Sequence, residues 1–230
     1  MYHIVQQTDD FLVIDKSPGI SVHRDQAETG LLEIIKREQH LDELYLVHRL
    51  DKMTSGLLLL AKNSIANSIL SELFAQRAVE KYYLALSDRK PKKKQGLIKG
   101  DMEKARRGAW KLTKTYAHPA ITQFFSHAIG NGERLFILRP YTGKTHQLRV
   151  ALKSIAAPIL GDTTYNTEAE AGPMDRGYLH SYVLGFNFNA MPYRYVLMPS
   201  QGERFLAPGF VETMEFLPDP ADYDWPHVVG

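Results

Sequence analysis

The chain has 230 residues, of which 44% are hydrophobic, and this is enough apolar material for a substantial core. It contains no cysteine, which excludes disulfides, thiolate zinc sites and a cysteine nucleophile. The net charge is only +2, so total charge does not indicate a nucleic-acid-binding protein, although Lys and Arg gather at residues 89–107 and 144–153.

The first half of the chain contains short strands and two helices. Each expected strand is a short apolar run, and each expected helix carries apolar residues at a helical period. On these criteria we expect strands over residues 11–14, 57–61 and 80–86, and helices over residues 31–39 and 64–76. The apolar stripe of residues 64–76 is most simply explained by core packing.

The second half of the chain is richer in strands. The cationic residues 88–107 should form an excursion or hairpin at the surface; a solvated charged loop is the simplest interpretation, and contact with phosphates is the second. The dipeptide Asn131-Gly132 is a strong hairpin-turn signal. We therefore expect paired strands over residues 120–126 and 134–138, followed by further strands over residues 178–188 and 193–198.

Many strands with few helices, and no regular alternation of the two, predict an α+β fold around a mixed, largely antiparallel sheet flanked by helices. We expect a single domain over residues 1–216 and, because prolines interrupt the end of the sequence, an extended C-terminal tail over residues 217–230 that lies on the surface or is partly disordered. No stretch approaches the ~20 apolar residues of a membrane span, and the N-terminus lacks a secretion-signal pattern. A soluble cytoplasmic protein is expected.

The most informative segment covers residues 48–56, His48-Arg49-Leu50-Asp51-Lys52-Met53-Thr54-Ser55-Gly56. It places Asp51 in a polar loop at the mouth of the buried strand expected over residues 57–61, where functional side chains are often found. Taken alone, Asp51 is more simply interpreted as a residue that caps a turn.

This segment resembles the signature of the RluA-type pseudouridine synthases, which reads His-or-Ala-Arg-Leu-Asp, two variable residues, then Thr-Ser-Gly. The match is complete at the fixed positions, and similar segments continue from about Asp15 to Ser181. The resemblance implies an enzyme that isomerises uridine in RNA to pseudouridine, with the pseudouridine synthase catalytic fold, an RNA-binding cleft and Asp51 as the catalytic carboxylate. We take His48, Arg49 and Thr54 as candidates for RNA or substrate binding.

The segment Lys81-Tyr82-Tyr83-Leu84-Ala85 resembles the second motif of this family, which reads Lys, any residue, Tyr, any residue, Ala. In that register the functional tyrosine is Tyr83. Successive residues of a strand point to opposite faces, so only one of the two tyrosines can readily share a side with Asp51. By the resemblance, Tyr83 stacks on the target uracil and is a candidate to accept the C5 proton; without it, packing of both rings on a sheet would be preferred.

The segment from Thr142 to Arg149 resembles the third motif, commonly Thr-Gly-Arg, a variable residue, His-Gln-Ile/Leu-Arg. Apolar residues at positions 148, 152 and 155 predict a helix that begins near Thr145 and places Lys144 in its first turn, where the helix dipole disfavours a cation by a few tenths to about 1 kcal/mol. The resemblance implies an ion pair between Lys144 and Asp51. Leu148 and Arg149 are further candidates for RNA binding.

The third motif departs from the family pattern at one position, because Lys144 stands where Arg is common. Lysine keeps the charge but lacks the planar fork that binds a carboxylate with two parallel hydrogen bonds. Related pseudouridine synthase families resemble this chain in having Lys at the matching place, so we interpret the change as tuning of the pair.

No metal and no cofactor are expected. The histidines at positions 23, 48, 146 and 180 lack the close helical spacing of zinc ligands, and no phosphate-binding or dinucleotide-binding motif is present. Isomerisation of uridine is redox-neutral, which fits this absence.

The expected partner is a stem-loop of rRNA or tRNA, recognised by a monomeric catalytic domain that begins close to the N-terminus. The target uridine should be flipped out of its stack, at a cost of a few kcal/mol, with Arg49 filling the gap or binding flanking phosphates. Asp51 would then attack the anomeric carbon or open a glycal route, and the sequence does not distinguish these two routes.

Two other classes of function stay open: a catalytically silent RNA-binding protein of the same fold, and a nucleoside or glycoside hydrolase, which usually needs two carboxylates.

Overall fold

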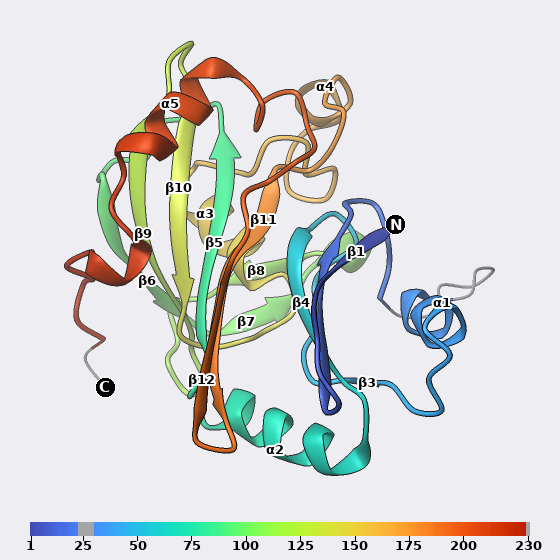
Figure 1. The fold of residues 1–230 in the computed structure, drawn as a ribbon. Coiled ribbons are helices and arrows are strands. Elements are labelled where there is room, and N and C mark those ends of the chain that lie inside the picture. The colour runs from blue at the N-terminus through green and yellow to red at the C-terminus, as the bar shows by residue number, and fades with distance from the viewer. Residues whose placement is uncertain (23–29, 229–230) are drawn as a thin grey trace. The chain divides into compact units, whose positions relative to one another are not determined.

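The computed structural model describes residues 1–22 and 30–228 of the chain. It divides into two compact units (Figure 1). The first unit comprises Met1–Lys81 and His180–Met198, and the second comprises Tyr82–Leu179 and Pro199–Gly230. Among the described residues, none of the helices is both long and apolar enough to cross a membrane.

The first unit is built on a mixed sheet. Its strands are β1 (Tyr2–Gln7), β2 (Phe11–Lys16), β3 (Tyr45–Leu46), β4 (Ser55–Ala61), β11 (Leu179–Phe188) and β12 (Met191–Val196). The order is β1-β2-β4-β11, with β3 paired to β4 and β12 paired to β11. Only the β4–β11 pair is parallel; the other described pairs of this unit are antiparallel.

Strand β4 forms the centre of this unit because all seven of its residues are buried. Leu57 and Leu59 belong to a hydrophobic cluster that also contains Phe11 and Phe186. The ring of Phe11 meets the ring of Phe186 edge-to-face at 5.4 Å between centroids, a favourable geometry for two aromatic rings. A strand covered on both faces explains the uninterrupted apolar run of residues 57–61.

Two helices belong to the first unit, α1 (Leu31–Glu38) and α2 (Ser64–Ala75). Asn63 caps the start of α2, since its Oδ1 accepts a hydrogen bond from the Ala66 amide at 2.8 Å. Leu70 is buried in the cluster beneath α2, and Ile69, Leu73 and Phe74 pack against it, so this part of the helical stripe is core packing, as expected. Ile65, at the start of the stripe, is instead 73% exposed.

The second unit contains an antiparallel sheet in the order β5-β10-β9-β6, with its strands side by side in Figure 1. The strands are β5 (Glu80–Ser87), β6 (Gln95–Gly100), β9 (Ala120–Ala128) and β10 (Arg134–Pro140). A separate two-stranded sheet joins β7 (Met102–Lys104) to β8 (Trp110–Leu112). The helices are α3 (Gln147–Ser154), α4 (Glu168–Ala171) and α5 (Pro208–Phe216), with short 3-10 turns at Arg106–Gly108 and Pro220–Asp222. The predicted α+β class with a mixed, largely antiparallel sheet is confirmed.

The charged segment 88–107 differs from the solvated loop that its composition favoured. Residues 95–100 form the edge strand β6, which pairs with β9 along its whole length. Glycines and lysines disfavour strands in isolation, so the pairing with β9 overrides local preference here. Surface exposure is retained at the preceding turn, where Lys92, Lys93 and Lys94 are exposed.

The C-terminal segment after α5 packs against the sheet of the second unit. The ring of Trp225 is only 8% exposed and stacks on Tyr82 with 5.6 Å between centroids. The Nε2 of Gln123 donates a hydrogen bond to the carbonyl of Pro226. Trp225 and Pro226 therefore lie against the face of the sheet that carries Tyr82.

Candidate functional site

Asp51 lies in a tight turn that immediately precedes β4. The amide of Thr54 donates to the carbonyl of Asp51 at 3.0 Å, and the side chain of Asp51 is half-buried. Thr54 itself is buried at 2% exposure, whereas Arg49 is exposed. The turn thus presents Arg49 to solvent while Thr54 anchors it.

The buried side chain of Lys16 connects this turn to the loop after β2. The side chain of Lys16 has no exposed surface, and its ammonium donates to the carbonyls of Ser17, Ile20 and Lys52 at 3.0, 2.8 and 3.3 Å. The carbonyl of Lys52 also accepts from the Gly19 amide at 2.8 Å. These bonds connect the loop after β2 to the Asp51 turn, and the charge of a buried ammonium makes such carbonyl contacts necessary.

His48 anchors the other side of the turn to β4. Its Nε2 accepts a hydrogen bond from the Leu59 amide at 3.0 Å, and its ring stacks on Phe74 with 4.5 Å between centroids. Because Nε2 accepts, the neutral ring carries its proton on Nδ1. Burial, with a smaller contribution from the charge of Lys81, lowers the pKa of His48 to about 3. These contacts give His48 a structural role, and RNA binding by this residue stays a prediction.

The Ser-Gly end of the motif is fixed by the parallel strand β11. The Nε2 of His180 lies 2.8 Å from the carbonyl of Leu197, so this nitrogen donates and Nδ1 accepts from the Ser55 hydroxyl at 2.7 Å. Gly56 has φ +99°, and a Cβ there would lie 2.3 Å from the Ser181 carbonyl. Only glycine permits this approach of the two strands.

Tyr83 and Tyr82 point to opposite faces of the second unit's sheet. Tyr83 in β5 pairs with Leu138 in β10, and Leu138 pairs with Phe124 in β9, so these three side chains share one face of the sheet. Thr122 lies two residues before Phe124 in β9 and therefore points to the same face. The side chain of Gln147 in α3 donates to the Thr122 hydroxyl on that face. Tyr83 therefore lies on the face that α3 covers.

Lys144 lies in the loop before α3, and the prediction that it occupies the first helical turn is wrong. The helix begins at Gln147, because its N-cap residue His146 adopts the left-handed conformation with φ 57°. The dipole penalty inferred from the sequence therefore does not apply to Lys144. Its ammonium donates to the carbonyl of His118.

Gln147 holds the Lys144 loop in place. Its Oε1 accepts from the Thr142 hydroxyl at 2.7 Å and from the Lys144 amide at 3.0 Å. Its Nε2 donates to the Ile121 carbonyl and the Thr122 hydroxyl, both at 3.0 Å. All four hydrogen-bonding positions of this buried amide are used, so it fixes both the loop and the strand beneath it.

Asp101 holds the backbone of residues 117–118, and the carbonyl of His118 accepts a hydrogen bond from Lys144. Its carboxylate accepts from the amides of Ala117 and His118 at 2.9 and 2.8 Å. Desolvation acts to raise the pKa of this carboxyl. Hydrogen bonds from Thr115 and the two amides, together with the charge of Lys144, nevertheless leave the pKa below its ordinary value.

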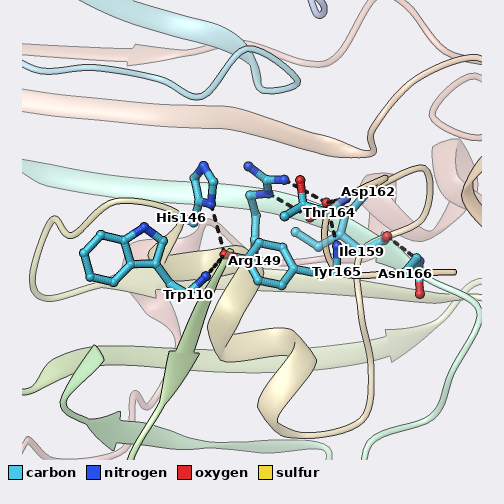
Figure 2. A network of polar contacts seen from close by, with 8 residues as sticks. All are labelled: Trp110, His146, Arg149, Ile159, Asp162, Thr164, Tyr165 and Asn166. Atoms are coloured by element: carbon cyan, nitrogen blue, oxygen red, sulfur yellow. Dashed lines mark hydrogen bonds and ion pairs between the residues drawn. The ribbon is translucent and has the colours of Figure 1, made fainter. Parts of the chain in front are cut away.

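Arg149 is 6% exposed and forms a bidentate ion pair with Asp162 at 2.7 and 2.8 Å (Figure 2). The guanidinium also lies 5.0 Å from the centroid of the Tyr165 ring. The hydroxyl of Tyr165 contacts Nδ1 of His146 at 3.0 Å and accepts from the Trp110 amide at 2.9 Å. This network ties α3 to the β7–β8 sheet. RNA binding by Arg149, and by Leu148, which is 7% exposed, stays a prediction.

The structure thus gathers His48, Arg49, Asp51 and Thr54 in one turn of the first unit. In the second unit, Tyr83 lies on the face of the sheet that α3 covers, Leu148 and Arg149 belong to α3, and Lys144 lies in the loop before it. Sequence reasoning gave no individual supporting role to the residues that hold these groups: Lys16, His180, Gln147, Asp101 and Asp162. They act through contacts between positions distant in the sequence, which a local pattern does not contain.

Of the four histidines considered for a metal site, His23 lies outside the described residues. Over positions 1–22 and 30–228, no three His, Asp or Glu side chains gather closely enough to hold a metal ion.

Comparisons with known proteins agree on one family. Residues 10–154 match the family described as RNA pseudouridylate synthase. An uncharacterized RNA pseudouridine synthase of Haemophilus influenzae is 50% identical over 212 residues, which cover 92% of this chain and 94% of the relative. Ribosomal large subunit pseudouridine synthase C of Rickettsia felis is 33% identical over 174 residues, which cover 72% of this chain and 56% of that relative.

A solved structure shares the fold. Human RNA pseudouridylate synthase domain containing 4 superposes with a TM-score of 0.71 and 26% identity, over 92% of this chain and 91% of the human chain. The predicted catalytic fold and the RluA-type assignment are thereby confirmed. The chain belongs to the RNA pseudouridylate synthase family, whose members are isomerases.

Proposed function

We propose that this protein isomerises a specific uridine of a structured RNA to pseudouridine, with Asp51 as the catalytic carboxylate. The observation that carries the proposal is the complete motif of residues 48–56, which the structure folds into a firmly held turn before β4. His48, Thr54 and Ser55 hold the turn, Gly56 permits the close strand, and Asp51 is the acid that this fixed turn carries at the start of β4.

The proposed chemistry needs an ionised carboxylate and a positioned base. Asp51 attacks the anomeric carbon of the uridine or removes a proton that opens a glycal route, and both routes release uracil for reattachment through C5. A neighbouring cation favours the charged form of an acid, and Lys144 is proposed to supply it. Tyr83 is proposed to stack on the uracil and to accept the C5 proton.

The target uridine is proposed to leave its stack before reaction, as enzymes that act on a base generally require. Arg49 is exposed and lies two residues from Asp51, which supports a role in filling the gap or binding the flanking phosphates. Thr54, Leu148 and Arg149 are proposed to contribute to RNA binding, and because all three are buried, we propose that they do so through the backbone segments that they hold.

Two exposed groups of cations support contact with an RNA backbone. One is the turn before β6, and the other is the β7–β8 hairpin, with exposed Lys104, Arg106, Arg107 and Lys111. Neutralising phosphates supplies much of the affinity of proteins for RNA and makes it depend on salt. Because total charge is only +2, the clusters and not the net charge are proposed to bind RNA.

Large-subunit ribosomal RNA is the proposed substrate, since the Rickettsia felis relative is named for it. A stem-loop of tRNA is the other outcome to be tested. We propose that the protein acts in the cytoplasm as a monomer without metal or cofactor, and that residues 1–216 function as one catalytic domain with residues 217–230 attached to it.

The test is conversion of RNA labelled with tritium at C5 of uridine. Isomerisation releases tritium and leaves the chain intact, hydrolysis yields free uracil, and a silent RNA-binding protein yields neither. Mapping pseudouridines in total RNA of cells with and without the gene identifies the position. Absence of tritium release from both rRNA and tRNA would refute the proposal.

A further inference from the structure

Tyr116 is an exposed aromatic residue in the loop between β8 and β9. Its side chain is 60% exposed, and the ammonium of Lys99, on the edge strand β6, lies 6.0 Å from the centroid of its ring. An isolated exposed aromatic needs no explanation, so its surroundings decide what it could do.

The loop that carries Tyr116 is held by several hydrogen bonds to a single residue. Asp101 donates its amide to the Thr115 carbonyl at 2.8 Å and accepts from the Thr113 amide at 2.8 Å. Its carboxylate accepts from the two residues that follow Tyr116, Ala117 and His118. The backbone on both sides of Tyr116 is thus fixed, and a fixed aromatic loses little freedom when a ligand stacks on it.

The same loop is joined to Lys144. The carbonyl that accepts from the Lys144 ammonium belongs to His118, two residues after Tyr116. Two cations lie near the ring, because the Lys99 ammonium is 6.0 Å from its centroid and Lys114 is exposed two residues before it. The nearby carboxylate of Asp101 is occupied by two backbone amides. A flat, exposed ring beside cations is the arrangement with which proteins bind unpaired bases and their phosphates.

We propose that Tyr116 and Lys99 form a platform on which an unpaired nucleobase of the RNA stacks, at a position flanking the target uridine. The ring supplies the stacking surface, and Lys99 and Lys114 face the adjoining phosphates. This inference rests on the proposed function, since Lys144 connects the platform to the reacting base. Stacking accepts any base, so the platform selects unpaired RNA and not a sequence.

The experiment compares Tyr116→Leu with a matched control, Phe216→Leu. Phe216 is an 86% exposed aromatic at the end of α5 in the same unit, and no proposed role involves it. On tritiated large-subunit rRNA, Tyr116→Leu should raise KM by about 5- to 100-fold with little change in kcat. Phe216→Leu should behave as wild type, and Tyr116→Phe, which keeps the ring, should recover most of the loss.

A direct binding measurement separates this inference from the proposed function. In a Tyr116→Trp variant, single-stranded oligouridylate should quench the emission attributable to position 116, whereas a fully paired duplex should not. Quenching with no tritium release would support the platform while refuting the proposed function. Tritium release with an unchanged KM in Tyr116→Leu, or equal quenching by the duplex, would overturn the platform.

Discussion

The loop that carries Asp51 and the loop that carries Lys144 are held in place in different ways. The Asp51 turn is fixed at several points, by the ammonium of Lys16, the ring of His48 and the contact between Ser55 and His180. The backbone of the Lys144 loop is fixed largely by one neutral amide, that of Gln147. The Asp51 loop should therefore tolerate the loss of one anchor, and the Lys144 loop should not.

The two loops should also respond differently to pH. The anchors of the Asp51 turn include an imidazole that must stay neutral to accept from Leu59, whereas an amide has no charge to gain. Acid should thus loosen the Asp51 turn and leave the Gln147 contacts intact.

The largest effect is expected at Asp51 itself. Asp51→Asn keeps the size of the side chain and removes the charge, so conversion of RNA should fall on the order of 10⁴-fold while RNA affinity stays close to wild type. Tritium release and filter binding measure the two quantities. Appreciable turnover by the variant would remove Asp51 from its proposed role.

Replacement of Lys144 should be the next most severe change. Lys144→Ala removes a cation proposed to act on the carboxylate and should lower kcat by about 10²- to 10³-fold. Lys144→Arg restores the residue common in the family and should retain most activity. Lys36→Ala, in the last turn of α1, is the control for loss of a lysine charge. Equal activity of the Ala and Arg variants would contradict the role of charge.

Gln147→Leu tests whether a single amide holds the Lys144 loop. The change leaves several buried polar partners without a hydrogen bond, which should lower the free energy of unfolding by about 3 kcal/mol. It should also lower kcat more than it raises KM, because Lys144 is displaced. Gln76→Leu, at an exposed position after α2, should change stability by less than about 0.5 kcal/mol. Similar losses in both variants would show that the contacts of Gln147 are unimportant.

The smallest effect concerns His48 and acid. Its folded pKa of about 3 lies below the ordinary value of 6.5, so its stabilising contribution is complete above pH 6.5 and is lost as the pH falls toward 3. At pH 5 the loss should be about 2 kcal/mol relative to neutral pH. Urea unfolding of wild type and His48→Ala at both pH values measures the difference. An equal pH dependence in the two proteins would show that His48 does not titrate in this way.

Local sequence patterns predicted the strands and helices that carry dense apolar residues. Helix α2 and strand β4 followed from helical spacing and an unbroken apolar run. Strand β6 was missed because its glycines and lysines have weak strand preference and its pairing with β9 is a distant contact. The packing of Trp225 on Tyr82 was missed for the same reason, since 143 positions separate the two rings (225 minus 82).

The sequence motifs indicated the candidate site residues themselves, but they did not indicate the contacts that hold those residues in place. Strand alternation separated Tyr83 from Tyr82, and the structure places them on opposite faces, with Trp225 against Tyr82. The start of α3 was placed two residues early, because spacing cannot reveal the left-handed turn at His146. The contacts of Gln147 depend on where strand β9 passes, which no local pattern contains.

The pairing of Gly56 with Ser181 has a consequence for synthesis of the protein. Ser55 and His180 are 125 positions apart, so a nascent chain exposes the Asp51 motif long before its parallel neighbour emerges from the ribosome. Until that neighbour arrives, one edge of β4 has no partner from β11, and the turn lacks its Ser55–His180 contact. The Asp51 turn therefore gains its complete set of contacts only after β11 has been synthesised, although Lys16 and His48 can hold it earlier.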